Sequence, residues 1–199
     1  MNIGIDVDGV LSDVADYQLK SGTRFFKKYG YAIIDENAFD VKDIFGCTEE
    51  ERSKFGWKTI WTYILWYPAT DNASKVIRKL KDEGHKIFII TGRVKVTERG
   101  LFGWLSRFIL KNWLKRRKIP YHDIHFCNEH NAVRDKTVGC EKYNVDIMIE
   151  DKPDNIMALS KITKVICYDC GYNRDCGGEN IFRARNWDEI YNLIKSFTI

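Results

Sequence analysis

The sequence has little of what marks fibrous, disordered or membrane-spanning proteins. Its 199 residues include only three prolines, and we find no low-complexity tract and no internal repeat. Collagen-like, solenoid and disordered chains are therefore excluded. No stretch approaches the eighteen or so uninterrupted apolar residues of a membrane span. The chain opens on a strand-like segment with acidic residues, not on a basic and then apolar signal, so we expect a cytoplasmic protein without a membrane partner.

A strong net charge and a disulfide framework are missing too. The formal net charge is +4, which does not call for a nucleic-acid partner and is compatible with a small anionic substrate. Six cysteines in a chain of this length do not make a disulfide scaffold. Cys167, Cys170 and Cys176 lie close enough in sequence to be weighed as a zinc site. No fourth ligand follows at the usual spacing, so ordinary packing is favoured.

The segment MNIGIDVDGVLSD at the N-terminus carries the most informative pattern. Ile3 and Ile5 belong to an apolar run typical of a central parallel strand buried on both faces. Asp6 and Asp8 interrupt the run, and Gly9 then places a turn at the carboxyl end of the strand. Two neighbouring carboxylates are costly to bury unless a cation neutralises them, so we expect a divalent metal. The alternative is a solvated turn, in which Asp-Gly is a common dipeptide.

Strand and helix signals alternate along the rest of the chain. Apolar residues spaced three and four apart predict a helix over 14–31 that ends at Gly30. The alternation predicts an α/β fold, a doubly wound (Rossmann-like) parallel sheet of about five strands. After the first strand, strands are expected at 87–90, 123–129, 147–149 and 164–169, and helices at 70–84, 101–118, 135–143 and 187–197.

Residues 14–69 are predicted to form a small helical cap inserted after the first strand, with residues 1–13 and 70–199 forming the α/β core. The end of this segment, GWKTIWTYILWYPA, is dense in aromatic residues. Most of these rings would form the small core of the cap. A lid over a pocket also supplies rings that stack on a base or sugar, so Trp57 and Trp61 are candidate substrate contacts.

The expected helix over 101–118 is basic and amphipathic, with Leu105, Phe108, Ile109 and Trp113 along one face. Such a helix could lie on a membrane or bind nucleic acid. A parallel sheet requires crossover helices, so we predict that this one packs its apolar face on the sheet and leaves its basic face in solvent.

Polar residues follow the expected strands at the sheet edge where ligands bind in such folds. A hydroxyl beside a glycine, as in Thr91-Gly92, suits phosphate binding. Lys136 lies in the expected helix over 135–143, and Glu150 and Asp151 follow the strand over 147–149. Because parallel strands end at one edge, all of these residues can converge with Asp6 and Asp8.

Four segments, DVDGV, ITGR, the lysine ahead of the last acids, and IEDKPDN, together resemble the four motifs of the haloacid dehalogenase superfamily. The IEDxPxN pattern, the small inserted cap and the turn Tyr172-Asn173-Arg174 are similar to the branch of 5'(3')-deoxyribonucleotidase-like phosphatases. The resemblance spans nearly all of the predicted core. The cap is too variable to be matched residue by residue.

The resemblance implies that Asp6 is the nucleophile, which forms an aspartyl-phosphate, and that Asp8 is the general acid and base. It implies Mg²⁺ held by the Asp6 side chain, the Asp8 backbone carbonyl and Asp151, with Glu150 acting directly or through a water. The groups implied to bind the phosphoryl oxygens are Thr91, Gly92 and Lys136, with Lys142 as a weaker substitute for the lysine, and Asn155 is implied to orient the Asp151 side.

The activity predicted on this basis is magnesium-dependent hydrolysis of a small phosphomonoester, in the first place a nucleoside monophosphate. A phosphatase of a sugar phosphate or another small metabolite is the alternative. A non-catalytic module that binds metal or phosphate is a third possibility, and a nucleic-acid-binding protein would rest on the basic helix alone. The preferred base or sugar and the oligomeric state are left open.

Overall fold

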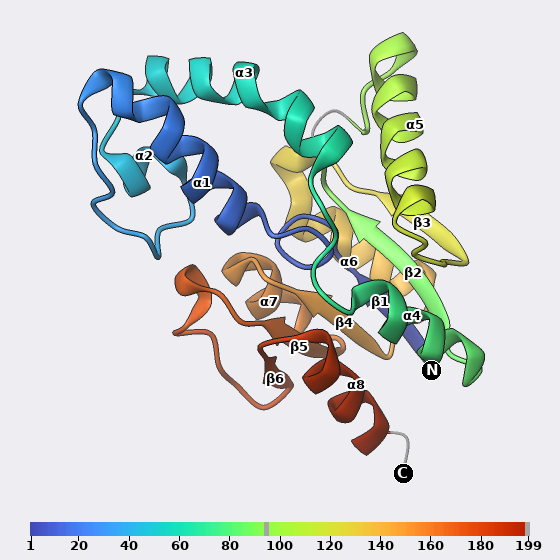
Figure 1. Cartoon of the computed structure of the whole chain (residues 1–199). Coiled ribbons are helices and arrows are strands. Elements are labelled where there is room, and N and C mark those ends of the chain that lie inside the picture. Colours follow the sequence, from blue (N-terminus) through green and yellow to red (C-terminus); the bar gives the residue numbers. More distant parts are fainter. Residues whose placement is uncertain (94–95, 198–199) are drawn as a thin grey trace.

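Six parallel strands form one sheet at the centre of the computed structural model, which describes residues 1–93 and 96–197 (Figure 1). Their order is β3-β2-β1-β4-β5-β6, so the chain order reverses beside the central strand β1. Ligands bind at such a switch point in doubly wound sheets. The strands are β1 (Asn2–Ile5), β2 (Lys86–Thr91), β3 (Asp123–Phe126), β4 (Ile147–Glu150), β5 (Lys164–Tyr168) and β6 (Ile181–Ala184).

The predicted doubly wound parallel sheet is confirmed, with six strands where about five were expected. The additional strand is β6, which pairs with β5 at the edge of the sheet. It has only four residues and buries only Ala184 completely. An edge strand of this kind lacks the continuous apolar run that identifies a central parallel strand.

Helices cover both faces of the sheet. On one face, α4 (Ala73–Asp82), α5 (Gly100–Arg116) and α8 (Trp187–Ser196) pack with Ile3 and Ile5 of β1 in the larger hydrophobic cluster. On the other face, α6 (Ala132–Lys142) and α7 (Pro153–Leu159) pack with Ile90 and Met148 in a second cluster. Successive strand residues thus point to opposite layers, so both faces of the strands are apolar, as the sequence indicates.

Residues 14–69 form helices that stand beyond the carboxyl edge of the sheet (Figure 1). The predicted helix over 14–31 is α1 (Val14–Phe26) followed by one 3₁₀ turn, η1 (Lys27–Tyr29), and it ends at Gly30 as predicted, with φ +79°. Two further helices, α2 (Val41–Phe45) and α3 (Glu49–Trp66), complete the segment. The division into core and cap stays a prediction. A separate hydrophobic cluster supports it, formed by Phe25, Phe26, Val41, Ile44, Phe45, Cys47 and Phe55.

The two ends of this helical segment meet at the sheet. The backbone N–H of Thr70 donates to the carbonyl of Leu11 at 2.9 Å, and its hydroxyl donates to the carbonyl of Val10 at 2.9 Å. The indole of Trp187, on α8, donates in turn to the Thr70 hydroxyl at 2.8 Å. The chain therefore enters and leaves the helical segment through two neighbouring stretches that are hydrogen-bonded to each other.

Helix α5 packs on the sheet through its C-terminal half, where Leu110, Trp113 and Leu114 are buried. The predicted apolar face is wrong at Phe108, whose exposed fraction is 51%. The reason is visible in Figure 1, where the N-terminal half of α5 extends past the end of β2 and leaves the sheet behind. None of the helices in the described part of the chain combines the length and the apolar character that a membrane span requires.

Candidate active site

The loop that follows β1 carries the two acids of the first motif. The backbone N–H of Asp6 still donates to the carbonyl of Ile149, at 3.1 Å, so Asp6 stays in line with the sheet. The chain then turns tightly at Gly9, whose φ is +89°. A Cβ built on Gly9 would lie 2.0 Å from Oδ2 of Asp151. Only glycine lets this loop approach the end of β4 so closely.

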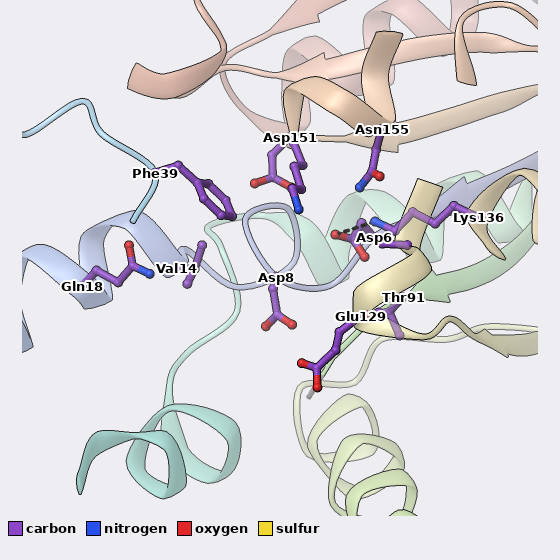
Figure 2. A pocket seen from close by; sticks show the side chains of 13 residues that line it. Asp6, Asp8, Val14, Gln18, Phe39, Thr91, Glu129, Lys136, Asp151 and Asn155 are labelled. Atoms are coloured by element: carbon purple, nitrogen blue, oxygen red, sulfur yellow. Dashed lines mark ion pairs between the residues drawn. The ribbon is translucent and has the colours of Figure 1, made fainter. Parts of the chain in front are cut away.

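Three buried carboxylates meet below this loop. Asp6, Glu150 and Asp151 offer oxygen atoms that all lie within 4.8 Å of one another. Figure 2 shows Asp6 and Asp151 on the same cavity, with Lys136 reaching Asp6. Among the described residues this is the group of acids, histidines and cysteines spaced to hold a metal ion, and Cys167, Cys170 and Cys176 do not form another.

Lys136 joins two of the three carboxylates. Its Nζ lies 3.1 Å from Oδ2 of Asp6 and 2.5 Å from Oε2 of Glu150. The other oxygen of Glu150 accepts from the backbone N–H groups of Asp151, at 3.3 Å, and Lys152, at 3.1 Å. Both oxygens of Glu150 are therefore used within the protein, and this residue fixes the ammonium group against Asp6.

The electrostatics of the cluster call for a further positive charge. Burial raises the pKa of Asp6 to about 7, and the neighbouring acids Glu150 and Asp8 add to the effect, while Lys136 opposes it. Burial and the charge of Glu150 likewise raise the pKa of Asp151 well above its usual range. Burial works against the charge of Lys136, but Asp6 and Glu150 outweigh it and raise the pKa of that ammonium group.

Unpartnered polar atoms line the same site. Oδ1 of Asp6, the hydroxyl of Thr91 and Oδ1 of Asn155 are all buried without a hydrogen-bond partner. Buried polar atoms without partners are rare in folded proteins. Carboxylate and amide oxygens are ligands that Mg²⁺ accepts, and a hydroxyl can donate to a phosphate. The residues present thus fit both a divalent cation and an anionic group bound to it.

The segment after β5 holds Asp151 from behind. The hydroxyl of Tyr172 donates to Oδ2 of Asp151, and the side-chain amide of Asn173 donates to the Asp151 carbonyl at 2.8 Å. Phe39, from the helical segment, packs edge-on against Tyr172 with ring centroids 5.0 Å apart. The adjacent Gly171 lies so close to Asn37 that a Cβ would sit 2.5 Å from its Oδ1. The residues before α2 therefore pack against Gly171 and Tyr172, in the segment that holds Asp151.

The cavity has a volume of about 190 Å³. From the sheet edge it is lined by predicted site residues, namely Asp6, Asp8, Thr91, Gly92, Lys136 and Asp151, with Asn155 beside them. Phe39, Val14 and Gln18 line it from the helical segment. The structure thus brings the predicted residues of four separate segments together around one cavity, and Glu150 lies behind them.

Other predicted residues lie elsewhere. The side chains of Trp57 and Trp61 are 69% and 50% exposed on α3, and neither lines the cavity. Lys142 is exposed at the end of α6, where it donates to the hydroxyl of Tyr143. Phe39 supplies the aromatic wall in place of the tryptophans. Nothing in its irregular, acidic stretch distinguishes it from an ordinary anchor of the helical segment.

Sequence reasoning also missed the partners of Asp8. Arg93, the residue after Thr91-Gly92, is 5% exposed and donates to Asp8 Oδ1 from Nη2 at 2.8 Å. Tyr63 of α3 donates to the same oxygen at 2.7 Å. The arginine in ITGR was the available signal, because it directly follows a buried strand and an arginine that becomes buried is almost always paired. Nothing in the sequence marks Tyr63 among the neighbouring rings.

Comparison with known proteins agrees with this geometry. Residues 1–198 match the family model described as 5' nucleotidase, deoxy (pyrimidine), cytosolic type C protein. A nucleotidase of Clostridium acetobutylicum is 30% identical over 197 residues, which cover 98% of this chain and 93% of that protein. A candidate 5'(3')-deoxyribonucleotidase of Chlorobaculum tepidum is 28% identical over 209 residues, covering 98% and 90%.

The fold is shared with a solved structure of a haloacid dehalogenase superfamily hydrolase from Ehrlichia chaffeensis. The TM-score is 0.56 at 13% identity, and the match covers all of this chain and 97% of that one. The family match and this shared fold together confirm the resemblance seen in the four motifs. The chain belongs to the 5' nucleotidase, deoxy (pyrimidine), cytosolic type C family, and it is a phosphoric monoester hydrolase with the fold of that solved hydrolase.

Proposed function

We propose that the protein is a magnesium-dependent phosphatase of nucleoside monophosphates that works through an aspartyl-phosphate on Asp6. One observation carries the proposal. The unpartnered Oδ1 of Asp6 lies in a buried cluster with Asp151 and Lys136, at the base of a cavity that Asp8 and Thr91 also line. A nucleophile, a cation site and an acid/base are thereby available to one bound phosphate. Six free thiols suit the reducing cytoplasm, where we place the enzyme.

The proposed cation site consists of the side chains of Asp6 and Asp151 together with the backbone carbonyl of Asp8. Glu150 belongs to the same cluster, but its bonds to Lys136 and to two backbone N–H groups favour an indirect part in metal binding. When bound, Mg²⁺ would offset the negative charge of the acids and draw electrons from a phosphoryl oxygen.

The residues divide the chemistry between them. An oxygen of Asp6 forms a bond to phosphorus as the phosphorus–ester oxygen bond breaks, and Asp8 gives its proton to the departing alcohol. Water then attacks the phosphorus of the aspartyl-phosphate and gives a proton to Asp8. The bond between phosphorus and the Asp6 oxygen breaks, so phosphate is released and Asp6 is restored. Lys136 and the N–H and hydroxyl groups of Thr91-Gly92 position the other phosphoryl oxygens and stabilise their charge.

The nucleoside is proposed to lie against Phe39. The cavity of about 190 Å³ is smaller than a pocket for a whole drug-sized molecule. It accommodates the phosphate and the nearest part of its ester group, so the base would extend toward the side where Phe39 and Gln18 form the wall. An aromatic face and an amide suit a nucleobase, whereas a sugar phosphate would leave the ring of Phe39 unused.

Phosphate release from a panel of substrates tests the proposal. With Mg²⁺ present, we expect hydrolysis of nucleoside and deoxynucleoside monophosphates ahead of sugar phosphates, and loss of activity on addition of a chelator. Asp6→Asn should abolish turnover. Asp154→Asn, an exposed carboxylate on α7, is the matched control and should retain it.

Two results would contradict the proposal. Hydrolysis confined to sugar phosphates would move the substrate class to the alternative. Absence of phosphate release from every substrate, in protein shown to bind Mg²⁺, would favour a non-catalytic metal-binding module. Retained turnover in Asp6→Asn would end the assignment of the nucleophile while leaving the substrate class standing.

A further inference from the structure

The carboxylate of Asp8 is held by side chains from two separate parts of the chain. Tyr63, on α3, donates its hydroxyl proton to Oδ1 at 2.7 Å. Arg93, which follows β2, donates to Oδ1 from Nη2 at 2.8 Å, and its Nε lies 3.1 Å from Oδ1 and 3.2 Å from Oδ2. Oδ1 therefore accepts three of the four hydrogen bonds, including the two shortest, and Oδ2 accepts one, from Nε of Arg93. Figure 2 shows this carboxylate turned away from Asp6 and Asp151.

Tyr63 is itself fixed as a donor. Its hydroxyl lies 2.8 Å from the hydroxyl of Ser12, at the end of the acidic loop. Because Tyr63 gives its one proton to Asp8, its oxygen can only accept in that pair, and the Ser12 hydroxyl has the Tyr63 oxygen and the Val7 carbonyl, at 3.3 Å, as its possible acceptors.

Arg93 is equally constrained. It is 5% exposed, and its guanidinium carbon lies 5.3 Å from the ring centroid of Tyr63 and 5.5 Å from that of Trp113. Aromatic faces at this range attract a guanidinium group. The two donors therefore support each other, and neither can turn away from Asp8 without losing a second contact.

We propose that Tyr63 and Arg93 are positioning residues that occupy Oδ1 of Asp8 and leave Oδ2 as the oxygen that carries the catalytic proton. The inference rests on the proposed function, since it assumes that Asp8 is the general acid. In the first step Oδ2 gives its proton to the ester oxygen as the phosphorus–oxygen bond breaks. In the second step Oδ2 takes a proton from the attacking water.

This arrangement makes the acid depend on the inserted helices. Tyr63 belongs to α3, within residues 14–69, while Asp8 and Arg93 belong to the sheet edge. The acid is fully oriented only while α3 lies against that edge. The helical segment then acts on the chemistry as well as on access to the cavity.

The test compares two leaving groups. The sugar alkoxide of a nucleoside monophosphate must be protonated as it departs, whereas the nitrophenolate of p-nitrophenyl phosphate departs without a proton. The constant kcat/KM reports steps up to the departure of the alcohol, so it isolates the acid step from the later hydrolysis. We expect Tyr63→Phe to lower kcat/KM for the nucleotide by about 10- to 100-fold, part of what a general acid contributes, and to leave the value for p-nitrophenyl phosphate nearly unchanged.

Tyr17→Phe is the matched control. Its hydroxyl donates to the carbonyl of Thr59 within the helical segment, and its ring lies 4.9 Å from that of Tyr63. Removing this hydroxyl disturbs the same aromatic group without touching Asp8, so the ratio of the two kcat/KM values should match that of the wild type. Arg93→Lys, which keeps the charge but loses the paired bonds, should shift the ratio in the same direction as Tyr63→Phe.

The outcomes separate this inference from the proposed function. If Tyr63→Phe lowers both kcat/KM values equally, or neither, the positioning role is overturned. If Asp8→Asn leaves the ratio unchanged, or the wild type hydrolyses no nucleotide, the proposed function fails instead. Thermal unfolding of each variant shows whether it is folded. If Tyr63→Phe is unfolded, the ratio of the two kcat/KM values in Arg93→Lys decides the question instead.

Discussion

Lys136 and Asp6 form a buried ion pair, with Nζ 3.1 Å from Oδ2 and both side chains less than a tenth exposed. The same ammonium group binds Glu150. The group proposed to bind phosphate is thus also the main charge compensation for two buried carboxylates. The site and the stability of the core meet in this one side chain.

Lys136→Met should therefore damage both stability and activity. Removing one partner of a buried ion pair leaves the others uncompensated, which costs about 3–5 kcal/mol of unfolding free energy. Urea unfolding measures this loss, and phosphate release should fall to background. Lys142→Met, an exposed lysine on the same helix, should change neither by a comparable amount. Equal stability of the two variants would contradict the compensating role.

Magnesium should stabilise the protein through Asp151. A ligand that binds only the folded state adds about 2.7 kcal/mol at a concentration 100 times its Kd. We expect the midpoint temperature of thermal unfolding to rise when MgCl₂ is added and to return to its original value when a chelator is added. Asp151→Asn should lose most of this shift, and Asp154→Asn should keep it. A full shift in Asp151→Asn would place the ion elsewhere.

Gly9→Ala should be more harmful than its backbone angle alone explains. Gly9 and Gly84 have nearly the same φ, +89° and +88°, but only Gly9 faces a neighbour, the carboxylate of Asp151. The left-handed conformation costs a non-glycine residue roughly 1–2 kcal/mol, and Gly84→Ala should lose about that much in chemical denaturation. Gly9→Ala should lose more and should also lose magnesium-dependent activity, while Gly84→Ala remains active.

Phe39 and Trp57 should differ in their effect on substrate binding. Phe39 lines the cavity and Trp57 does not. Phe39→Ala should raise KM for nucleotides about tenfold or more, because a stacked base contributes about 1–3 kcal/mol. Inhibition by inorganic phosphate should be little changed. Trp57→Ala should leave KM near the wild-type value, and a larger effect of Trp57 than of Phe39 would restore the tryptophan as the base contact.

His85 should make the protein less stable in mild acid. It is 5% exposed, Nδ1 lies 3.3 Å from the N-terminal amino group, and burial together with that charge lowers its pKa below 6.5. The folded state thus binds this proton less readily than the unfolded state. Its contribution to stability is present above about pH 6.5 and is lost as the pH falls through the lowered pKa. Denaturant unfolding at pH 7 and pH 5 should show a smaller loss in His85→Gln, with exposed His130→Gln as the control.

The sequence predicts those parts of the site that lie at the carboxyl ends of the parallel strands. Thr91 ends a parallel strand, and Asp6 and Asp151 each directly follow one. Because parallel strands end at one edge, the meeting of these residues can be predicted without knowledge of side-chain packing. The hydrogen bonds that Tyr63 and Arg93 donate to Asp8 form only when α3 packs over that edge. Local sequence patterns do not predict this packing. The same holds for Phe39, whose place is set by docking against Tyr172. Strand β6 was not predicted for a different reason, because a short edge strand lacks the buried apolar run by which central strands are recognised.

The hydrogen bonds that join Thr70 to Val10 and Leu11 have a consequence for how this enzyme could be remodelled. They bring the entry and exit of residues 14–69 within one hydrogen bond of each other, at a point already secured by the sheet. A foreign insert whose ends are equally close could be grafted between these positions without altering the strand order. On the proposed function, substrate preference would be exchanged together with this segment, provided that the graft supplies its own hydroxyl donor to Asp8.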